Sequence, residues 1–211
     1  MAGPVGDEVV RVAAFAERAR IVACLSRAFE DDPVSRFLFP RDRSRLSRLV
    51  GFYREVIRST LPEGVVYTDP AVRGAAIWRA PSPPTVGRMR ALRDGLRMLL
   101  VLRRAVSRAL QLEQAISTAR PREPHWYLAI LGTEPSHQGR GVGSALIEPV
   151  LRRCDSEGLP AYLESSKEEN IPFYQRHGFR VTQVLTIPDG PTLWSMRRDP
   201  RTLNREAGST D

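Results

Sequence analysis

The chain has 211 residues, 42% hydrophobic and 27% charged, a composition typical of a folded globular protein and not of a disordered one. Its formal net charge is +8, but the basic residues are almost all arginine, and acidic residues interrupt them along the chain. Nucleic-acid-binding proteins more often gather their cations in a stripe with interleaved aromatic residues. We therefore expect no nucleic-acid partner.

Neither the cysteines nor the N-terminus indicates a metal site, an export signal or a membrane span. Cys24 and Cys154 have no His or Cys neighbour at metal-ligand spacing. We therefore predict two free thiols without a chemical role, and no metal. No run approaches about 18 apolar residues, so we expect no membrane partner. The N-terminus carries acids where a secretory signal needs a basic region. We expect a cytoplasmic protein, either a monomer or a homodimer.

The first part of the chain predicts short strands and two amphipathic helices. The expected elements are a strand at 8–14, helices at 17–28 and 43–60, and strands at 65–68 and 72–78. The Asp31-Asp32-Pro33 stretch is expected to end the first helix, and residues 37–40 are predicted to form an apolar turn. Asp69-Pro70 predicts a hairpin between the two later strands.

Residues 88–120 predict a long, uneven helix with one apolar and one basic face. The apolar face comprises Met89, Leu92, Leu96, Leu99, Leu100 and Leu110, and the basic face comprises Arg90, Arg93, Arg97, Arg104 and Arg108. A basic amphipathic helix can lie on a membrane surface. The alternative, which we favour, is a helix that packs on its own domain and leaves a solvated face.

The remaining chain predicts an α/β (α+β) fold, with strands on either side of helices. The expected elements are strands at 126–133, 161–164, 179–187 and 193–197, and helices after Gly143 and at 170–177. The first of these strands shows little polar alternation, which predicts burial on both faces. Its successor at 161–164 should run parallel to it after a helical crossover, within which Pro149 is expected to introduce a kink. Residues 199–211 are expected to form a flexible tail.

A glycine-rich loop joins the apolar strand 126–133 to the following helix. Its sequence is Gln138-Gly-Arg-Gly-Val-Gly143, with glycines at alternate positions. Backbone N–H groups and a helix N-terminus at such a loop favour an anion, which predicts a phosphate-bearing ligand. No Lys-Ser/Thr pair follows the last glycine, so the loop is not a Walker loop, and the alternation differs from the dinucleotide fingerprint. The alternative is a turn that only requires glycine torsions.

A second motif follows one helix and one strand later, as Asn170-Ile-Pro-Phe-Tyr174-Gln-Arg-His-Gly178-Phe179. The two motifs together resemble those of the GNAT superfamily of acetyl-CoA-dependent N-acetyltransferases. Within it, residues 123–196 are most similar to the puromycin N-acetyltransferase group. The shared stretches are Trp126-Tyr-Leu, Pro135-Ser-His-Gln-Gly, Leu163-Glu-Ser, Ile171-Pro-Phe-Tyr and Asp189-Gly-Pro. Asp32 departs from that group, whose enzymes carry an aromatic residue there.

The resemblance implies a GNAT fold, in which a mixed central sheet has two splayed parallel strands and is flanked by helices. It implies a single domain over 1–198, with the helical segment 85–120 contributing to the acceptor side. Acetyl-CoA would be the co-substrate, with no metal. The implied binding residues are Ile130, Leu131, Gly132, Thr133, Gln138, Gly139, Arg140, Gly141, Val142, Gly143, Ser144, Asn170, Phe173 and Arg176.

Transfer from a thioester to an amine requires a base and an acid. An alkyl ammonium has a pKa of about 10.4, so its deprotonation at pH 7 costs about 4–5 kcal/mol unless a base accepts the proton. The resemblance makes Glu164 the candidate base or amine anchor and Tyr174 the candidate acid for the departing thiolate. Asp31 and Asp32 are candidates to attract a cationic substrate, or else form a helix-ending turn.

The expected function is direct transfer of an acetyl group to a primary amine of a small molecule, aminonucleoside-like or drug-like. No covalent enzyme intermediate is expected, because no cysteine lies at a matched motif position. Two alternatives stay open. One is a protein lysine or N-terminal acetyltransferase, and the other is a non-catalytic acyl-CoA-binding module.

Overall fold

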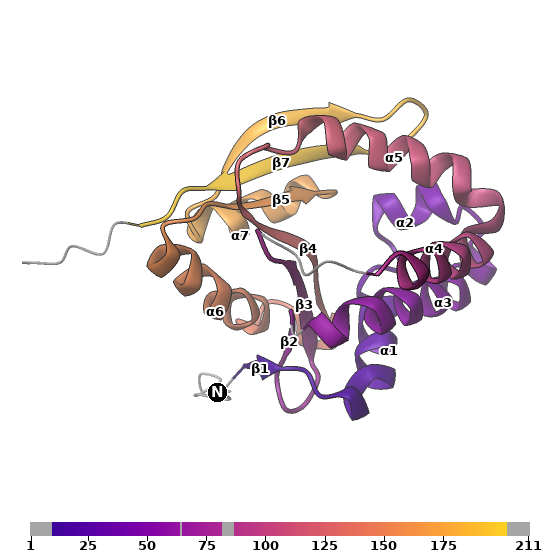
Figure 1. Ribbon diagram of the computed structural model, residues 1–211, viewed down its shortest axis with the longest axis horizontal. Helices are drawn as coiled ribbons and strands as arrows, with labels where there is room; N and C mark the ends of the chain where they lie inside the picture. The colour runs from indigo at the N-terminus through magenta and orange to yellow at the C-terminus, as the bar shows by residue number, and fades with distance from the viewer. Residues whose placement is uncertain (1–9, 64, 82–86, 202–211) are drawn as a thin grey trace, which may run out of the picture.

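A seven-stranded mixed sheet forms the centre of the computed structural model, which describes residues 10–63, 65–81 and 87–201 (Figure 1). The strands are β1 (Arg11–Val12), β2 (Val66–Thr68), β3 (Gly74–Arg79), β4 (Trp126–Thr133), β5 (Ala161–Ser165), β6 (Arg180–Thr186) and β7 (Thr192–Arg198). Their order is β1-β2-β3-β4-β5-β7-β6. Among these described strands β4 and β5 pair in parallel, and the other neighbours pair antiparallel.

Helices cover both faces of the sheet. They are α1 (Arg18–Ala28), α2 (Pro33–Leu38), α3 (Asp42–Thr60), α4 (Arg88–Leu102), α5 (Val106–Ala119), α6 (Val142–Glu157) and α7 (Ile171–Arg176). The central strand β3 shows the two resulting cores, because Ala75 and Ile77 pack on the side of α1 and α3, whereas Ala76 and Trp78 pack on the side of α6. Burial on both faces explains why β3 reads as a continuous apolar run. The predicted mixed sheet with flanking helices is confirmed.

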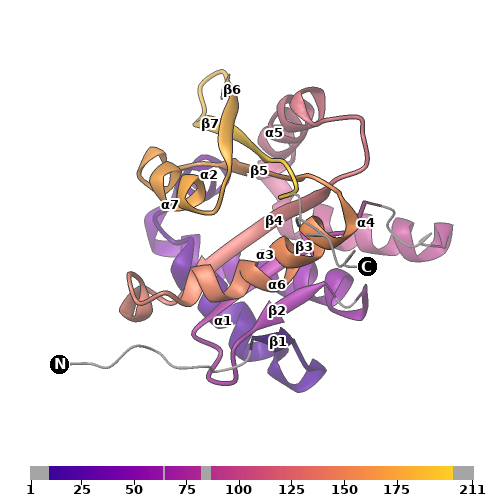
Figure 2. The ribbon, with the colours of Figure 1, turned by 90° about the vertical axis from the view of Figure 1, so that its left-hand side faces the viewer.

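The parallel strands β4 and β5 separate soon after they meet (Figure 2). They pair at Trp126 with Ala161 and at Tyr127 with Tyr162, and no further pair joins their described residues. On the other edge of β4, the register with β3 skips Ala129, which is therefore a β-bulge. A bulge bends its strand, and this one lies where β4 leaves β5. The splay implied by the family resemblance is confirmed.

Strand β4 is not buried on both faces, contrary to the prediction. Trp126, Leu128 and Gly132 are buried, but the intervening residues are half-buried. The physical reason is the splay, because a strand that leaves its neighbour no longer has that neighbour's side chains beside it. One edge of β4 is therefore exposed to the gap between β4 and β5. The sequence of β4 gave no sign of this gap, because its residues show little polar alternation.

The predicted turn at residues 37–40 is wrong in its first half, because Phe37 and Leu38 belong to helix α2. This helix begins directly after Asp32, whose Oδ1 accepts hydrogen bonds from the backbone N–H groups of Val34 (2.9 Å) and Ser35 (3.4 Å). Pro33 occupies the first helical position, where a missing N–H costs nothing. The Asp-Pro pair therefore both follows one helix and starts the next.

The predicted helix at 88–120 is two helices, α4 and α5, which meet at a corner at Arg103. The predicted packing of its apolar face is also wrong, since Met89, Leu92 and Leu100 are 80%, 69% and 67% exposed. Helix α4 instead packs through its other side, with Met98 and Leu102 at the core and an ion pair of 2.8 Å between Asp94 and Arg58 of α3. Its apolar ridge points to solvent.

Smaller differences concern element ends. The first strand is limited to β1, and residues 8–9 of its predicted range lie outside the described residues, as do residues 202–211 of the predicted tail. Helix α6 continues through Pro149 to Glu157. None of the described helices is long and apolar enough to span a bilayer. The predicted hairpin at Asp69 is confirmed by antiparallel pairing of β2 with β3.

Candidate active site

The glycine loop has an open surface. Gly139 and Gly141 have φ values of 72° and 84°, and Gly141 is the N-cap residue of α6. A Cβ added at either position would meet no heavy atom within 4 Å. These glycines are therefore required by the left-handed backbone and not by crowding. A ligand can approach the loop's backbone N–H groups and the positive end of α6 closely.

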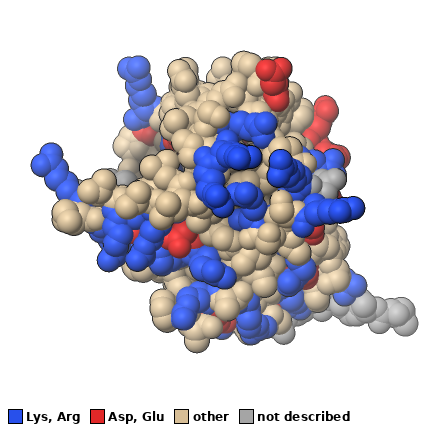
Figure 3. Space-filling model, turned by 90° about the vertical axis from the view of Figure 1, so that its right-hand side faces the viewer, with Lys and Arg blue, Asp and Glu red and all other residues tan. Residues whose placement is uncertain are grey.

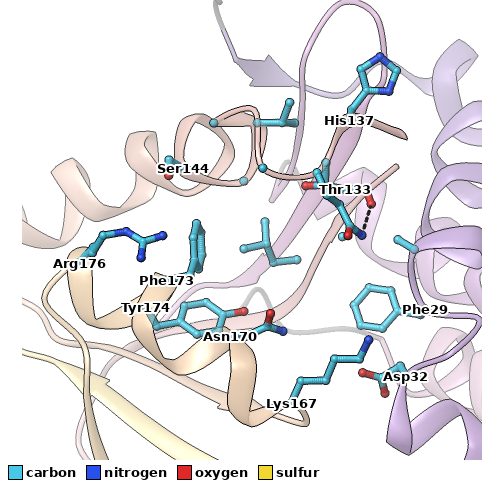
Figure 4. A pocket seen from close by; sticks show the side chains of 18 residues that line it. Phe29, Asp32, Thr133, His137, Ser144, Lys167, Asn170, Phe173, Tyr174 and Arg176 are labelled. Carbon is cyan, nitrogen blue, oxygen red and sulfur yellow. Dashed lines mark hydrogen bonds between the residues drawn. The ribbon is translucent and has the colours of Figure 1, made fainter. Parts of the chain in front are cut away.

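A cavity of about 460 Å³ opens beside this loop (Figure 4). Twelve of the fourteen predicted coenzyme-binding residues line it: Leu131, Gly132, Thr133, Gln138, Gly139, Gly141, Val142, Gly143, Ser144, Asn170, Phe173 and Arg176. Ile130 lines a neighbouring cavity, whereas Arg140 lines neither. The predicted residues come from three separate stretches of sequence, and the fold brings them to one place.

The opposite wall of this cavity contains the predicted Asp32 together with residues that were not predicted for the site. Figure 4 shows Phe29 and Asp32 across the cavity from Phe173 and Arg176, and Lys167, the only lysine of the chain, points into it. His137 also lines this cavity. The one available signal for Lys167 is that it is an isolated lysine in an arginine-rich chain.

The side of the cavity near α6 and α7 has a polar pair. The Ser144 hydroxyl lies 3.0 Å from Nε2 of His177, and the tautomer of the ring decides which of them donates. Burial lowers the pKa of His177, which favours the neutral ring at neutral pH. Arg176 adds a permanent positive charge to this wall.

A second cavity, of about 280 Å³, lies on the other side of the splayed strands. Phe29 and Asp32 line both cavities, so the two adjoin. Helix α5 contributes Leu112, Glu113 and Ile116 to its wall. The described part of the predicted segment 85–120 therefore reaches this second cavity through α5.

Glu164 on β5 lines the second cavity and has one free carboxylate oxygen. Its Oε2 accepts a hydrogen bond of 2.6 Å from the Tyr127 hydroxyl, while its Oε1 is buried without a partner among the described groups. Burial raises the pKa of Glu164, and the nearby Arg120 opposes this shift. A buried carboxylate with a raised pKa and a vacant acceptor is suited to receive a proton.

Tyr174 on α7 lines the first cavity. Its ring is largely buried and packs against Phe173 and Phe179, with ring centroids 5.0 and 5.9 Å away. Figure 4 shows its hydroxyl pointing toward the cavity, on the side of Asn170. Burial raises the pKa of Tyr174, so the phenol stays protonated and is able to donate a proton.

The two candidate acids near α2 are separated by the fold. Asp32 is buried and commits one oxygen to the α2 cap and the other to the Ser166 hydroxyl, at 2.5 Å. Asp31 is exposed, pairs with Arg36 at 3.0 Å and lines neither cavity. The predicted pair of substrate carboxylates is thus reduced to Asp32.

A splayed parallel strand pair, with a glycine loop at one end of the gap and a buried glutamate at the other, defines an acetyltransferase fold. Residues 107–179 match the Acetyltransferase (GNAT) family. An uncharacterized N-acetyltransferase of Schizosaccharomyces pombe is 30% identical over 200 residues, covering 88% of this chain and 81% of that protein. The chain belongs to the GNAT acetyltransferase family.

Solved structures agree with this fold. The Corynebacterium glutamicum structure named histone acetyltransferase HPA2 and related acetyltransferase is 24% identical, with a TM-score of 0.65 and coverage of 93% of this chain and 98% of that one. The polyamine N-acetyltransferase of Drosophila melanogaster is 15% identical, with a TM-score of 0.61 and coverage of 92% and 100%. At these identities the likeness concerns the fold alone.

Proposed function

We propose that this protein transfers an acetyl group from acetyl-CoA directly to a primary amine of a small molecule. The observation that carries the proposal is the gap between β4 and β5, which has an anion-binding glycine loop on one side and the free oxygen of Glu164 on the other. Membership of the GNAT family supports the same reaction class.

The residues around the loop fit the coenzyme. Its diphosphate would bind the open backbone between Gln138 and Gly143, where any Cβ at 139 or 141 would occupy the approach. Its pantetheine arm would bond the β4 edge at Ile130, Leu131 and Thr133, which β5 leaves unpaired. Acetyl-CoA supplies an acetyl group already activated as a thioester.

The two titratable side chains then divide the proton transfers. Glu164 accepts a proton from the acceptor ammonium, directly or through a water molecule, and its raised pKa brings it closer to neutral pH than an ordinary glutamate. Tyr127 holds the carboxylate in place through Oε2. Tyr174 donates its proton to the departing sulfur from the other side of the gap.

The second cavity favours a small acceptor. Its volume of about 280 Å³ suits a compact amine, and its walls carry the carboxylates of Asp32, Glu113 and Glu164. An acceptor lysine or N-terminal amine of a protein is the alternative. The aminonucleoside-like acceptor, the likeness to the puromycin group, the cytoplasmic location and the monomeric or homodimeric state stay predictions.

A thiol-release assay tests the proposal. Purified protein is mixed with acetyl-CoA and a panel of small amines and short peptides, and free thiol is followed with a colorimetric thiol reagent. Release with small amines, abolished in Glu164→Gln, supports the proposal, and release only with peptides supports the alternative acceptor. Binding of acetyl-CoA without release by any amine supports the non-catalytic module and contradicts the proposed enzyme.

A further inference from the structure

A cavity lined by arginines lies away from the glycine loop and shares no described lining residue with the cavity beside that loop. It has a volume of about 510 Å³ and lies where α2 and the start of α3 meet the corner between α4 and α5. Five arginines line it: Arg41, Arg48, Arg103, Arg104 and Arg108. Figure 3 shows basic side chains gathered near the middle of this face, which is the right-hand side of Figure 1.

These arginines are not neutralised by their described surroundings. No described carboxylate lies within 4.0 Å of their guanidinium nitrogens, although ion pairs join arginines to acids elsewhere in the described chain. Arg108 is held by a hydrogen bond of 3.1 Å to the Phe37 carbonyl and by a cation–π contact with the Phe37 ring, and among the described residues no such contact holds the other four. Like charges so gathered repel one another, so an anion between them would remove that repulsion.

The backbone adds to the positive field of this corner. Arg41 and Ser44 belong to the N-terminal end of the 19-residue helix α3, whose N-cap makes no side-chain hydrogen bond. Arg103 has φ of 49° and ψ of −112°, a conformation that residues with a Cβ rarely adopt. The chain therefore holds a strained residue at the corner that presents Arg103 and Arg104 to the cavity, and such strain concentrates at functional sites.

We propose that this arginine cavity binds a ligand with several phosphate groups. Guanidinium groups pair with phosphate oxygens in a planar, bidentate geometry. Five of them around one cavity provide more hydrogen-bond donors than a single carboxylate accepts. Buried Leu38 and Phe39 line both this cavity and the proposed acceptor cavity, and they form a wall between them. The proposed phosphate site is therefore a different cavity from the proposed acceptor site.

The phosphates have two possible sources. One is a soluble polyphosphate compound, and the other is an acidic phospholipid headgroup. Helix α4 ends at the buried Leu102, which lines this cavity, and its exposed ridge includes Leu96 and Leu99, 58% and 49% exposed. This ridge offers apolar contact to lipid chains beside the cavity. The arginines would bind the phosphates of either source in the same way. The experiment below therefore tests each source with its own probe.

The experiment compares two charge-matched double variants of the full chain. Arg41→Gln with Arg104→Gln removes two exposed cavity arginines. Arg122→Gln with Arg152→Gln removes two exposed arginines outside this cavity and is the control. Calorimetry with inorganic tripolyphosphate tests the soluble source, and co-sedimentation with phosphatidylcholine vesicles, with or without phosphatidic acid, tests the lipid source. The melting temperature of each variant checks that it is folded.

Specific loss in the cavity variant supports the proposal. We expect the variant to bind tripolyphosphate, or vesicles that contain phosphatidic acid, about tenfold more weakly or worse, and the control to bind like the unmodified protein. Binding confined to acidic vesicles assigns the ligand to a lipid headgroup. Equal loss in both variants, no loss in either, or no binding of either probe by the unmodified protein overturns the proposal.

Discussion

The carboxylate of Glu164 is the side chain on which the proposed chemistry depends most. Replacement by Gln keeps its size and its contact with Tyr127 but removes the base. We predict that Glu164→Gln lowers kcat by about 100-fold or more, as loss of a general base does, while acetyl-CoA affinity stays the same. In the unmodified enzyme, kcat/KM should fall as the pH is lowered through the raised pKa of Glu164. An unchanged kcat in the thiol-release assay would remove Glu164 from this role.

The same carboxylate makes a stability prediction independent of activity. Because its pKa is raised on folding by burial, its contribution to stability is full below the unfolded pKa of about 4.5 and is lost as the pH rises through the folded value. Glu164→Gln should therefore raise the melting temperature at pH 8, and the difference from the unmodified protein should shrink toward pH 4. A lower melting temperature at pH 8 would contradict the burial argument. Calorimetric scans across this pH range make the comparison.

Tyr174 combines packing with proton donation, and Phe separates the two. Tyr174→Phe keeps the ring contacts with Phe173 and Phe179 and removes the hydroxyl. We predict a fall in kcat of about 100-fold, within the usual range for general acids, with little change in the Kd for acetyl-CoA. A variant that binds the coenzyme poorly but turns over normally would show a packing role only.

Among the elements, the glycine loop offers a matched pair of substitutions. Gly141 begins α6 and Gly158 ends it; both have positive φ, and a Cβ added at either would meet open space. Alanine at either position costs about 1–2 kcal/mol of backbone strain. We predict that Gly141→Ala also weakens acetyl-CoA binding by about tenfold or more, because its Cβ enters the ligand's approach, whereas Gly158→Ala does not. Equal affinities in calorimetry would show that the loop does not hold the coenzyme.

Helix α4 provides a test of the exposed ridge. Leu96 is 58% exposed and Leu102 is 7% exposed, although both belong to one helix. We predict that Leu96→Gln changes the free energy of unfolding by less than about 0.5 kcal/mol, whereas Leu102→Ala lowers it by about 2–5 kcal/mol. Urea unfolding measures both values. A large loss from Leu96→Gln would mean that the ridge is covered in solution.

This helix also shows why hydrophobic periodicity predicted the element but not its orientation. The spacing of leucines correctly predicts helical structure, and it identifies the apolar side. It does not say which side packs, and here the other side packs, through Met98, Leu102 and the ion pair of Asp94 with Arg58. Similarly, the Asp32-Pro33 signal correctly predicts the end of one helix but does not reveal that the same residues start the next. That helix, α2, has only six residues, too few to show a clear hydrophobic period.

At the scale of the whole molecule, the part of the site made from contiguous sequence was the predictable part. The glycine loop and its flanking strand and helix are local and supply nine of the twelve predicted lining residues, while the second motif supplies the other three. Residues from distant segments, such as Phe29 and Lys167, become neighbours only in the folded chain. Adjacent residues can also diverge, and for this reason Asp31 faces solvent while Asp32 reaches the site.

The two buried cysteines have a practical consequence for every assay on the intact protein. Burial raises the pKa of Cys24 and of Cys154 to about 12, so neither is present as a reactive thiolate at neutral pH. The native chain should therefore contribute almost no signal to thiol detection.

The bulge at Ala129 also makes one change to this enzyme testable without touching any reactive group. Leu128 packs in the core on the α6 side and Ile130 in the core on the α1 side, although side chains two positions apart in a regular strand point the same way. Ala129 is therefore the extra residue, and its deletion would leave Ile130 and Leu131 on their present sides, at their different cavities. An enzyme with all its acids and bases intact would then lose only the bend with which β4 turns away from β5.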